Sequence, residues 1–238
     1  MATVQELSDP YAHFMLNPLA PQTADVCEVC TTFTEGYPTC YPCGHNAVFA
    51  DAVLPISYSV HFGQLHTALR GYKGDSIRAA ERFRFQLAAV MWRFLGQHEQ
   101  CLARAVGVQA FDVVTTVPSG WAERDEKHPL HEIVGKLVGP TRPRYERLLS
   151  RSGVEIGERE VDLRKYDARR RLDGESVLLV DDTWTTGASV QHVAASPLWV
   201  SPSDWAGMCA LPLREPCREA PRGCASLAMR ARQATTVR

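Results

Sequence analysis

Two kinds of hydrophobic run occur along the chain. In residues 77–94, apolar side chains recur at helical spacing, with Ser76 before them as an N-cap and Gly96 after them as a terminator. The segments "FDVVTTV" (111–117) and "SVLLVDD" (176–182) are instead continuous runs rich in β-branched and aliphatic residues. Such runs indicate strands that are buried on both sides, as in a parallel sheet.

The alternation of helices and strands predicts the α/β class, with a parallel sheet and flanking helices. Further helices are predicted at residues 99–106, 130–138, 144–149 and 187–195. The first 24 residues contain three prolines that break any long element, so we expect an irregular lead-in there.

Composition divides the chain into three parts. We predict a cysteine-rich, zinc-binding knuckle at residues 25–46, an α/β domain at residues 58–196 and an atypical C-terminal segment at residues 197–238. The last part holds five prolines, six arginines and no lysine, and Pro197 and Pro202 interrupt the α/β pattern. We expect much of it to be irregular, although "WAGMCALPL" has the composition of a strand.

The bulk composition narrows the class of protein. The 238 residues are 45% hydrophobic and 22% charged, with a net charge of −1. These values predict a soluble globular protein and argue against a generally basic nucleic-acid binder, while a local basic patch stays open. The first 20 residues have no secretory pattern, and no apolar run is long enough for a membrane span. We therefore predict a cytoplasmic protein whose eight cysteines stay reduced unless a metal binds them.

The strand at residues 176–182 ends in an acidic pair, Asp181 and Asp182. Open α/β sheets bind ligands beyond the carboxyl ends of their strands. Neighbouring strand residues point to opposite sides, so the two carboxylates can reach different groups, such as adjacent sugar hydroxyls or a hydrated cation. The next residues, "TTGAS" (185–189), lead into a helix whose first N–H groups attract phosphate. Together these features predict a site for a sugar phosphate.

The stretch "VLLVDDTWTTGAS" resembles the signature of type I phosphoribosyltransferases, which bind 5-phosphoribosyl-1-pyrophosphate (PRPP). The resemblance implies that Asp181 and Asp182 are catalytic and meet the ribose hydroxyls, and that the turn after them wraps the 5′-phosphate. Trp184 is bulkier than the residue expected at its position. The substrate-binding residues implied in this turn are Thr183, Thr185, Thr186, Gly187, Ala188 and Ser189.

Other nucleotide sites fit the sequence less well. No GxxxxGK[ST] precedes the acidic pair, as a P-loop nucleotidase would require, and no GxGxxG follows a first strand, as a dinucleotide fold would require. A strand, turn and helix with a purely structural role is the remaining alternative.

The segment "CEVCTTFTEGYPTCYPC" contains two CxxC pairs separated by nine residues. Two such pairs close a tetrahedral site of four thiolates, which suits Zn²⁺ in a structural role because no position stays open for catalysis. The nine residues between the two pairs are fewer than the usual fifteen to twenty. His45 is an alternative ligand, four free thiols are the metal-free alternative, and Cys101 is predicted to lie in the core. The proposed zinc ligands are Cys27, Cys30, Cys40 and Cys43.

A cysteine knuckle before a phosphoribosyltransferase domain resembles the plan of the ComF-type competence proteins. The segment "LHTALRGYKGD" (65–75) is similar to the linking segment of that family. The resemblance covers residues 27–195. It implies a phosphoribosyltransferase fold and roles in DNA uptake, and it implies the fold more firmly than a particular reaction.

The loop after residues 111–117 resembles, by position, the loop that cradles pyrophosphate in phosphoribosyltransferases. Ser119 and Gly120 offer backbone N–H groups there, and Arg124 offers a guanidinium for phosphate oxygens. The Arg-Gly-Phe-Asn stretch usual in the family is not found, and an ordinary polar connection is the alternative. The later run "RKYDARRRL" either closes over pyrophosphate or forms a solvated surface. Its basic residues are Arg164, Lys165, Arg169, Arg170 and Arg171.

The resemblance implies a transfer of the phosphoribosyl group from PRPP to a nitrogen acceptor, with release of pyrophosphate. Such a displacement passes through an oxocarbenium-like transition state. Mg²⁺ shared between substrate oxygens and a few carboxylates stabilises the leaving group. Two alternatives stay open: a non-catalytic PRPP-fold adaptor for the DNA-uptake machinery or single-stranded DNA, and a relative that has lost its activity.

Overall fold

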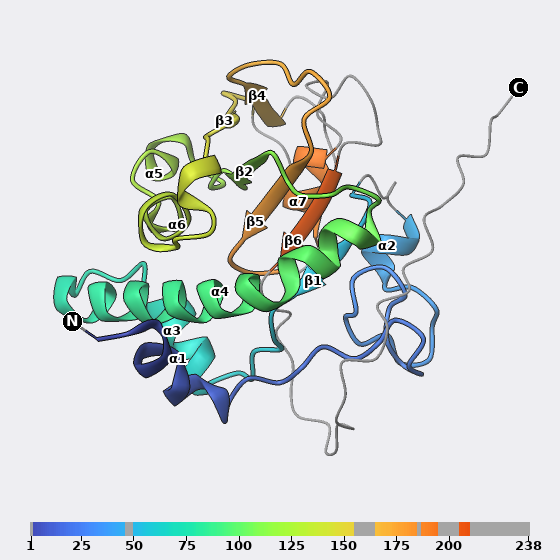
Figure 1. Ribbon diagram of the computed structural model, residues 1–238. Coiled ribbons are helices and arrows are strands. Elements are labelled where there is room, and N and C mark those ends of the chain that lie inside the picture. The colour runs from blue at the N-terminus through green and yellow to red at the C-terminus, as the bar shows by residue number, and fades with distance from the viewer. Residues whose placement is uncertain (1, 46–49, 155–164, 185–186, 195–204, 210–238) are drawn as a thin grey trace, which may run out of the picture.

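Four short strands form a parallel sheet in the order β1-β6-β5-β2 (Figure 1). The structure is a computed structural model that describes residues 2–45, 50–154, 165–184, 187–194 and 205–209. The register places Val113 beside Val177 and Val177 beside Trp205, and each neighbouring pair of strands runs parallel. The prediction of an α/β fold with a parallel sheet and a cysteine knuckle is confirmed.

The boundaries of the elements are as follows. The sheet consists of β1 (Val53–Pro55), β2 (Val113–Thr116), β5 (Val177–Asp181) and β6 (Trp205–Cys209). A separate antiparallel pair consists of β3 (Leu149–Arg151) and β4 (Tyr166–Ala168). The α-helices are α1 (Val4–Ala12), α2 (Tyr41–His45), α3 (Gln64–Gly71), α4 (Ile77–Ala105), α5 (Ala122–Asp125), α6 (Pro129–Glu132) and α7 (Ala188–Ala194). A π-helical turn, η1 (Ile133–Leu137), and a 3₁₀ turn, η2 (Arg142–Arg144), complete the set.

The side chains of β5 alternate between two cores, as its continuous apolar sequence predicts. Val177 and Leu179 pack in the core that also contains residues of α7 and the knuckle cysteine Cys27. Leu178 and Val180 pack on the other side of the sheet, in the core formed with α4 and η1. All four strand residues are at most 1% exposed. The knuckle therefore shares its core with the α7 side of the sheet.

Helix α4 is one continuous helix of 29 residues, and Figure 1 shows it running along one side of the sheet. The expected stop at Gly96 and the separate helix at residues 99–106 are wrong. Leu95 and Leu102 are buried one heptad apart, so the apolar stripe continues past the glycine. This packing outweighs the roughly 1 kcal/mol that a helical glycine costs. Cys101 is exposed on this helix rather than buried in the core, which corrects a further prediction.

Two other segments differ from the sequence prediction. The N-terminal lead-in contains α1, which begins with a capping box between Thr3 and Glu6 and contains Pro10. Tyr11 holds α1 against α4, because its buried ring packs near α4 and its hydroxyl donates to Gln86 at 2.9 Å. The helix expected at residues 144–149 is instead extended, with the Glu146 N–H donating to the Val114 carbonyl beside β2.

Two strands of the sheet come from outside residues 58–196. Strand β1 precedes residue 58, and β6 lies in the C-terminal segment, where the apolar "WAGMC" pairs with both β5 and β1. The strand expected in that segment is therefore present. The division of the chain into domains stays a prediction. Among the described residues, none of the helices combines the length and the apolar composition needed to cross a membrane.

Candidate functional site

The acidic pair lies at the carboxyl edge of the sheet. Strand β5 ends at Asp181, and the Val117 N–H, just after β2, donates to the Val180 carbonyl at 3.0 Å. The segments that follow β2 and β5 therefore leave the same edge of the sheet side by side. This is the edge at which parallel sheets bind ligands.

Asp182 already has two partners from the segment between α3 and α4. The Tyr72 hydroxyl donates a hydrogen bond to Asp182 Oδ2, and the Lys73 ammonium pairs with the same oxygen. The Lys73 side chain is 41% exposed and that of Asp182 is 13% exposed. The Asp182 N–H donates to Asp181 Oδ1 at 2.9 Å, which holds the Asp181 carboxyl against the backbone of the next residue.

The environments of the two carboxyls push their pKa values apart. Burial and the negative charge of Asp182 raise the pKa of Asp181 to about 8. Burial also opposes ionisation of Asp182, but the Lys73 ammonium and the Tyr72 hydroxyl outweigh it and lower that pKa. Burial lowers the pKa of the nearby His128 to about 4, so its imidazole is neutral at pH 7. At neutral pH the ligand-free pair therefore holds one proton and one negative charge.

An apolar cavity of about 40 Å³ explains the high pKa of Asp181. It is lined by both aspartates and, apart from Tyr72, by aliphatic side chains such as Met91, Leu130 and Ile133. A charged carboxylate in such surroundings lacks the water that would solvate it, which favours the protonated form.

The turn after β5 is tight where the structure describes it. Gly187 has φ +70°, and a Cβ at this position would lie 2.1 Å from the Trp184 ring, so only glycine fits. Trp184 is 2% exposed and packs in the core of the α7 side, which accounts for the bulky residue in the motif. Thr183 precedes it, and Ser189 lies in the first turn of α7 beside Tyr166, whose hydroxyl bonds to it. Thr185, Thr186 and the side chain of Ala188 lie outside the described residues.

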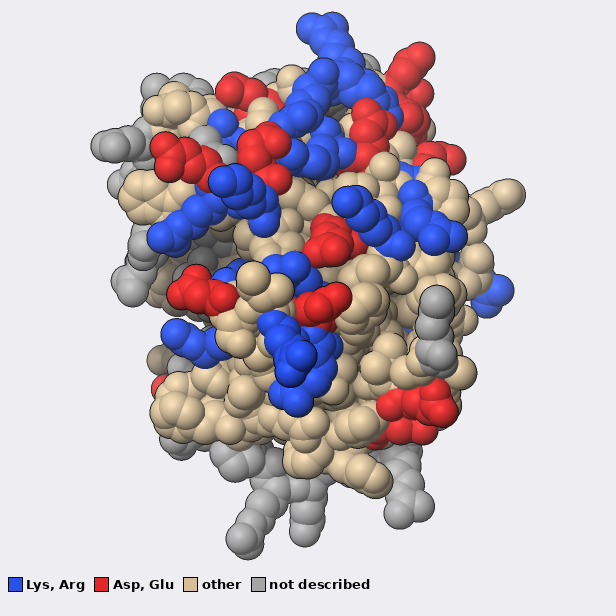
Figure 2. Space-filling model, turned by 90° about the vertical axis from the view of Figure 1, so that its left-hand side faces the viewer, with Lys and Arg blue, Asp and Glu red and all other residues tan. Residues whose placement is uncertain are grey.

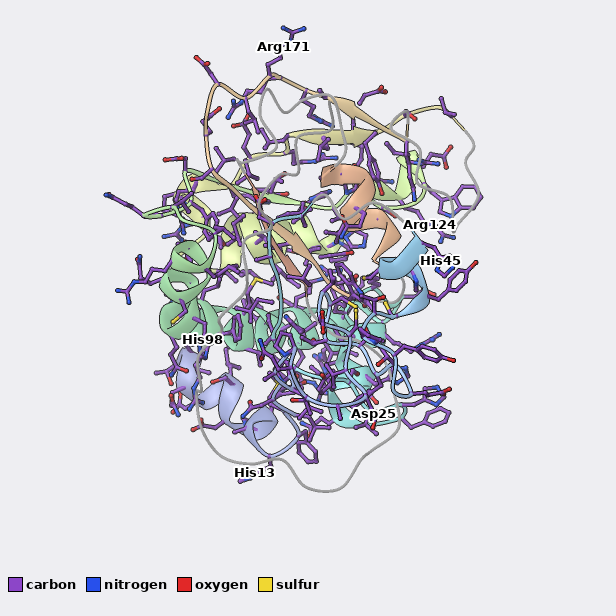
Figure 3. The ribbon with its side chains drawn as sticks, turned by 90° about the vertical axis from the view of Figure 1, so that its right-hand side faces the viewer. His13, Asp25, His45, His98, Arg124 and Arg171 are labelled. Carbon is purple, nitrogen blue, oxygen red and sulfur yellow. The ribbon has the colours of Figure 1, made fainter. Side chains whose placement is uncertain are left out.

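The candidate pyrophosphate loop has internal partners. The Ser119 N–H donates to the buried Asp125 at 2.8 Å, and the Gly120 carbonyl accepts from Arg151 at 3.2 Å. Arg124 is exposed on α5 and lies at the periphery in Figure 3. The loop thus lies at the same edge of the sheet as the acidic pair, while the Ser119 N–H is already bonded within the protein.

Two residues of the basic run before β5 are bound to acidic residues. Arg170 pairs with Glu146 and Glu175 at 2.8 and 2.6 Å, and Arg169 pairs with Glu126 at 3.1 Å. Arg171 extends away from the molecule in Figure 3. Arg164 lies outside the described residues. The arrangement favours a structural surface network over a pyrophosphate clamp for Arg169 and Arg170.

Four cysteines converge in the knuckle. The sulfur atoms of Cys27, Cys30, Cys40 and Cys43 all lie within 4.8 Å of one another, and Figure 3 shows sulfur atoms gathered near α2. The Cys30 and Cys40 sulfurs are 3.6 Å apart. Tetrahedral zinc with bonds near 2.3 Å separates its sulfur ligands by about 3.8 Å, so this spacing fits a metal and not a disulfide. The four cysteines are positioned to bind a metal such as zinc.

Both CxxC pairs are closed by the same type of backbone hydrogen bond. The Thr31 N–H donates to the Cys27 carbonyl at 3.0 Å, and the Gly44 N–H donates to the Cys40 carbonyl at 2.9 Å. Each hydrogen bond spans four residues and curls the pair so that both thiols face the same point. Thr31 takes φ +59° to close the first turn, a conformation that costs a β-branched residue energy and that the cluster holds in place.

The sulfur cluster cannot hold four negative charges without a metal. Hydrogen bonds from the other thiols, first Cys30, lower the pKa of Cys27, whereas the same crowding, first by Cys27, raises the pKa of Cys43. His45 does not join the cluster, because its ring stacks on Tyr41 and Nδ1 donates to the Tyr41 carbonyl at 2.9 Å. The donor set is four sulfurs.

Comparisons of the chain with protein-family models, curated proteins and solved structures found no match.

Three residues near the acidic pair were not predicted as site residues from the sequence: Tyr72, Lys73 and His128. Tyr72 and Lys73 lie in the segment 65–75, whose similarity to a linking segment was the available signal. Their partner is about a hundred residues away in the chain, and sequence spacing carries no information about that contact. His128 lies near Tyr72, with ring centroids 6.3 Å apart.

The raised pKa of Asp181 predicts that the difference in stability between wild type and Asp181→Asn depends on pH. The Asp181 carboxyl binds its proton more tightly in the folded chain than in the unfolded chain. The contribution of Asp181 to the free energy of unfolding therefore falls as the pH rises toward about 8. In Asp181→Asn this contribution is absent. Wild type should therefore lose stability relative to Asp181→Asn between pH 6 and pH 8.5.

Urea unfolding of both proteins at the two pH values, without added Mg²⁺, measures this difference. Groups other than the acidic pair contribute equally to both proteins and cancel. A stability difference that is the same at pH 6 and pH 8.5 would show that Asp181 is not protonated in the folded chain.

Proposed function

We propose that the chain is a phosphoribosyltransferase, which binds PRPP with Mg²⁺ and transfers its phosphoribosyl group to a nitrogen acceptor with release of pyrophosphate. The observation that carries this proposal is the delivery of Asp181 and Asp182 by a doubly buried parallel strand to the carboxyl edge of the sheet. The glycine-dependent turn and α7 follow directly. The type I phosphoribosyltransferase-like fold and the ComF-type family plan are part of the same proposal.

The residues at this edge fit a bound divalent cation. Asp182 already attracts the Lys73 ammonium, and both aspartates offer the oxygen ligands that Mg²⁺ prefers. When bound, Mg²⁺ would neutralise charge on the pyrophosphate leaving group. Asp181 must then release its proton, because a protonated carboxyl is a poor ligand for a cation.

The protein's own groups supply positioning and electrostatics. Asp181 and Asp182 would hold the ribose hydroxyls, and residues 183–189 would enclose the 5′-phosphate. The exposed part of Lys73 allows it to leave Asp182 and contact a substrate phosphate, so we propose it as a further substrate-binding residue. An acceptor nitrogen would attack ribose C1 while the bond to pyrophosphate breaks, and no covalent nucleophile of the protein is required.

The metal of the knuckle would be Zn²⁺ in a structural role. Four sulfur ligands leave no open coordination position for a substrate. Cys27 and Cys30 are buried in the same core as Trp184, so a metal here would stabilise the side of the sheet that holds the ligand turn.

The alternative, an adaptor whose knuckle binds single-stranded DNA, is not favoured by the charge distribution. The 69 residues before Arg70 contain six aspartates and glutamates and neither lysine nor arginine. Binding to nucleic-acid phosphates depends mainly on lysine and arginine. The knuckle therefore lacks the side chains that such binding needs.

Release of pyrophosphate from PRPP tests the proposal. The purified chain should release pyrophosphate in the presence of Mg²⁺ and at least one member of a panel of nitrogen bases. Asp182→Asn should lose this activity. Asp173→Asn should retain it, because Asp173 is exposed and lies before β5, at the opposite end of the strand from the acidic pair. No release with any base, or equal release from Asp182→Asn, would count against the transferase.

A further inference from the structure

A second cavity lies on the face formed by α4, α6, η1 and the residues that follow α5. It is an open groove of about 470 Å³, a volume in the range of small-molecule sites. Figure 2 shows the face on which α5 and α6 lie, where lysine, arginine and acidic side chains are intermixed. The side chains that line the groove and matter here are Arg84, Lys127, His128, Lys136, Tyr145 and Arg147.

The groove has an excess of positive charge. Arg84 pairs with Glu132 at 3.2 Å, and Arg147 pairs with Asp125 and Glu126. Lys127 and Lys136 are exposed, and neither forms an ion pair within the part of the chain that the structure describes. Two ammonium groups at one groove are therefore available to an anion.

His128 adds a hydrogen-bond donor. Its Nδ1 accepts from the Leu130 N–H at 3.3 Å, so the proton of the neutral ring lies on Nε2. Among the described residues no hydrogen bond occupies that Nε2. The neutral ring can donate this proton to an oxygen of a ligand.

The wall behind the groove is rigidly held. His131 Nδ1 bonds to the Tyr145 hydroxyl at 2.7 Å, and its Nε2 donates to the Asp125 carbonyl at 2.8 Å. The Tyr145 ring covers Gly135, where a Cβ would lie 2.4 Å from it. Gly135 lies in η1, and such π-helical turns occur frequently at functional sites. The rings of His131 and Tyr145, held in place by these contacts, suit a planar ligand.

The groove is distinct from the cavity of the acidic pair. Leu130 and Ile133 of the α6–η1 segment line the apolar cavity together with the two aspartates. His128, Glu132 and Lys136 of the same segment line the groove. One segment therefore separates the two spaces, and a ligand in the groove need not contact Asp181 or Asp182.

We propose that this groove is a second binding site, which takes a small organic anion whose carboxylate or phosphate is attached to a ring. The anionic group contacts Lys127 and Lys136 and accepts from His128 Nε2. The ring lies against Tyr145. This site does not depend on the proposed transferase activity.

Titrations of the full chain with phenyl phosphate, benzoate and the neutral benzamide test the proposal, with binding followed by protein NMR shifts. At least one anion should bind and shift the amide signals of Gly135 and Lys136. The tighter of the two identifies phosphate or carboxylate as the preferred group. Benzamide should bind about tenfold more weakly, because it lacks the charge that the lysines attract.

Matched variants locate the site. The double variant Lys127→Gln, Lys136→Gln should weaken binding of the anion by about fivefold to tenfold, since two partly screened charges are lost. Arg171→Gln removes an exposed charge away from the groove and should leave binding unchanged. Wild-type affinity in the double-lysine variant, equal binding of benzamide, or no anion binding at millimolar concentration would overturn the proposal.

Discussion

Replacing Cys27 with serine is expected to release the knuckle metal and to lower the free energy of unfolding by at least about 3 kcal/mol. The side chain is fully buried, and its sulfur is one of four that meet within 4.8 Å. Loss of one ligand leaves three thiols that cannot all ionise together. Because Cys27 shares a core with Val177 and Leu179, the loss of stability should extend to the sheet and not be confined to the knuckle.

Metal content and thermal unfolding measure this effect. Wild type should hold one zinc ion for each chain and lose stability when a strong chelator is added. Cys101→Ser is the matched control, because Cys101 is exposed on α4 and lies outside the cluster. If Cys27→Ser kept one zinc ion and an unchanged unfolding temperature, the four-sulfur site would be wrong.

Replacing Gly187 with alanine is expected to destabilise the chain by roughly 2–4 kcal/mol. Two costs add at this position. The residue has φ +70°, which disfavours any side chain, and the new Cβ would lie 2.1 Å from the buried Trp184 ring. Trp184 cannot move aside without opening the core on the α7 side.

Gly174→Ala separates these two costs. Gly174 has φ +77°, but a Cβ added there would meet no atom within 4 Å, so this variant carries only the backbone strain of roughly 1 kcal/mol. Urea unfolding of the two variants should therefore differ by the cost of the clash with Trp184. Equal destabilisation would mean that Trp184 does not pack against the turn.

The elements that the sequence predicted well are those that a local pattern of residues determines. The apolar run of β5 permits only a strand buried on both sides, and its acidic end then falls at the sheet edge. The two CxxC pairs predicted the four-sulfur cluster for a local reason, because two thiols at this spacing can face one point, and the structure brings all four together and leaves His45 outside.

The sequence was less informative where packing between distant segments determines the structure. Gly96 has the local pattern of a helix end, but Leu102 extends the buried stripe beyond it. Tyr72 and Lys73 reach Asp182 across about a hundred residues of sequence, and no local pattern encodes that contact. The groove could not be predicted for the same reason, because its lining residues Lys136 and Tyr145 come from different parts of the chain.

The binding of PRPP tests the central claim most directly. Thermal unfolding of wild type, Asp181→Asn and Asp182→Asn should be followed while PRPP is added with Mg²⁺. Wild type should gain stability in a saturable way, by about 2.7 kcal/mol at a hundredfold excess over Kd, because the ligand binds only the folded chain. Both variants should gain far less. No stabilisation of wild type, or the same gain in all three proteins, would contradict a sugar-phosphate site at the acidic pair.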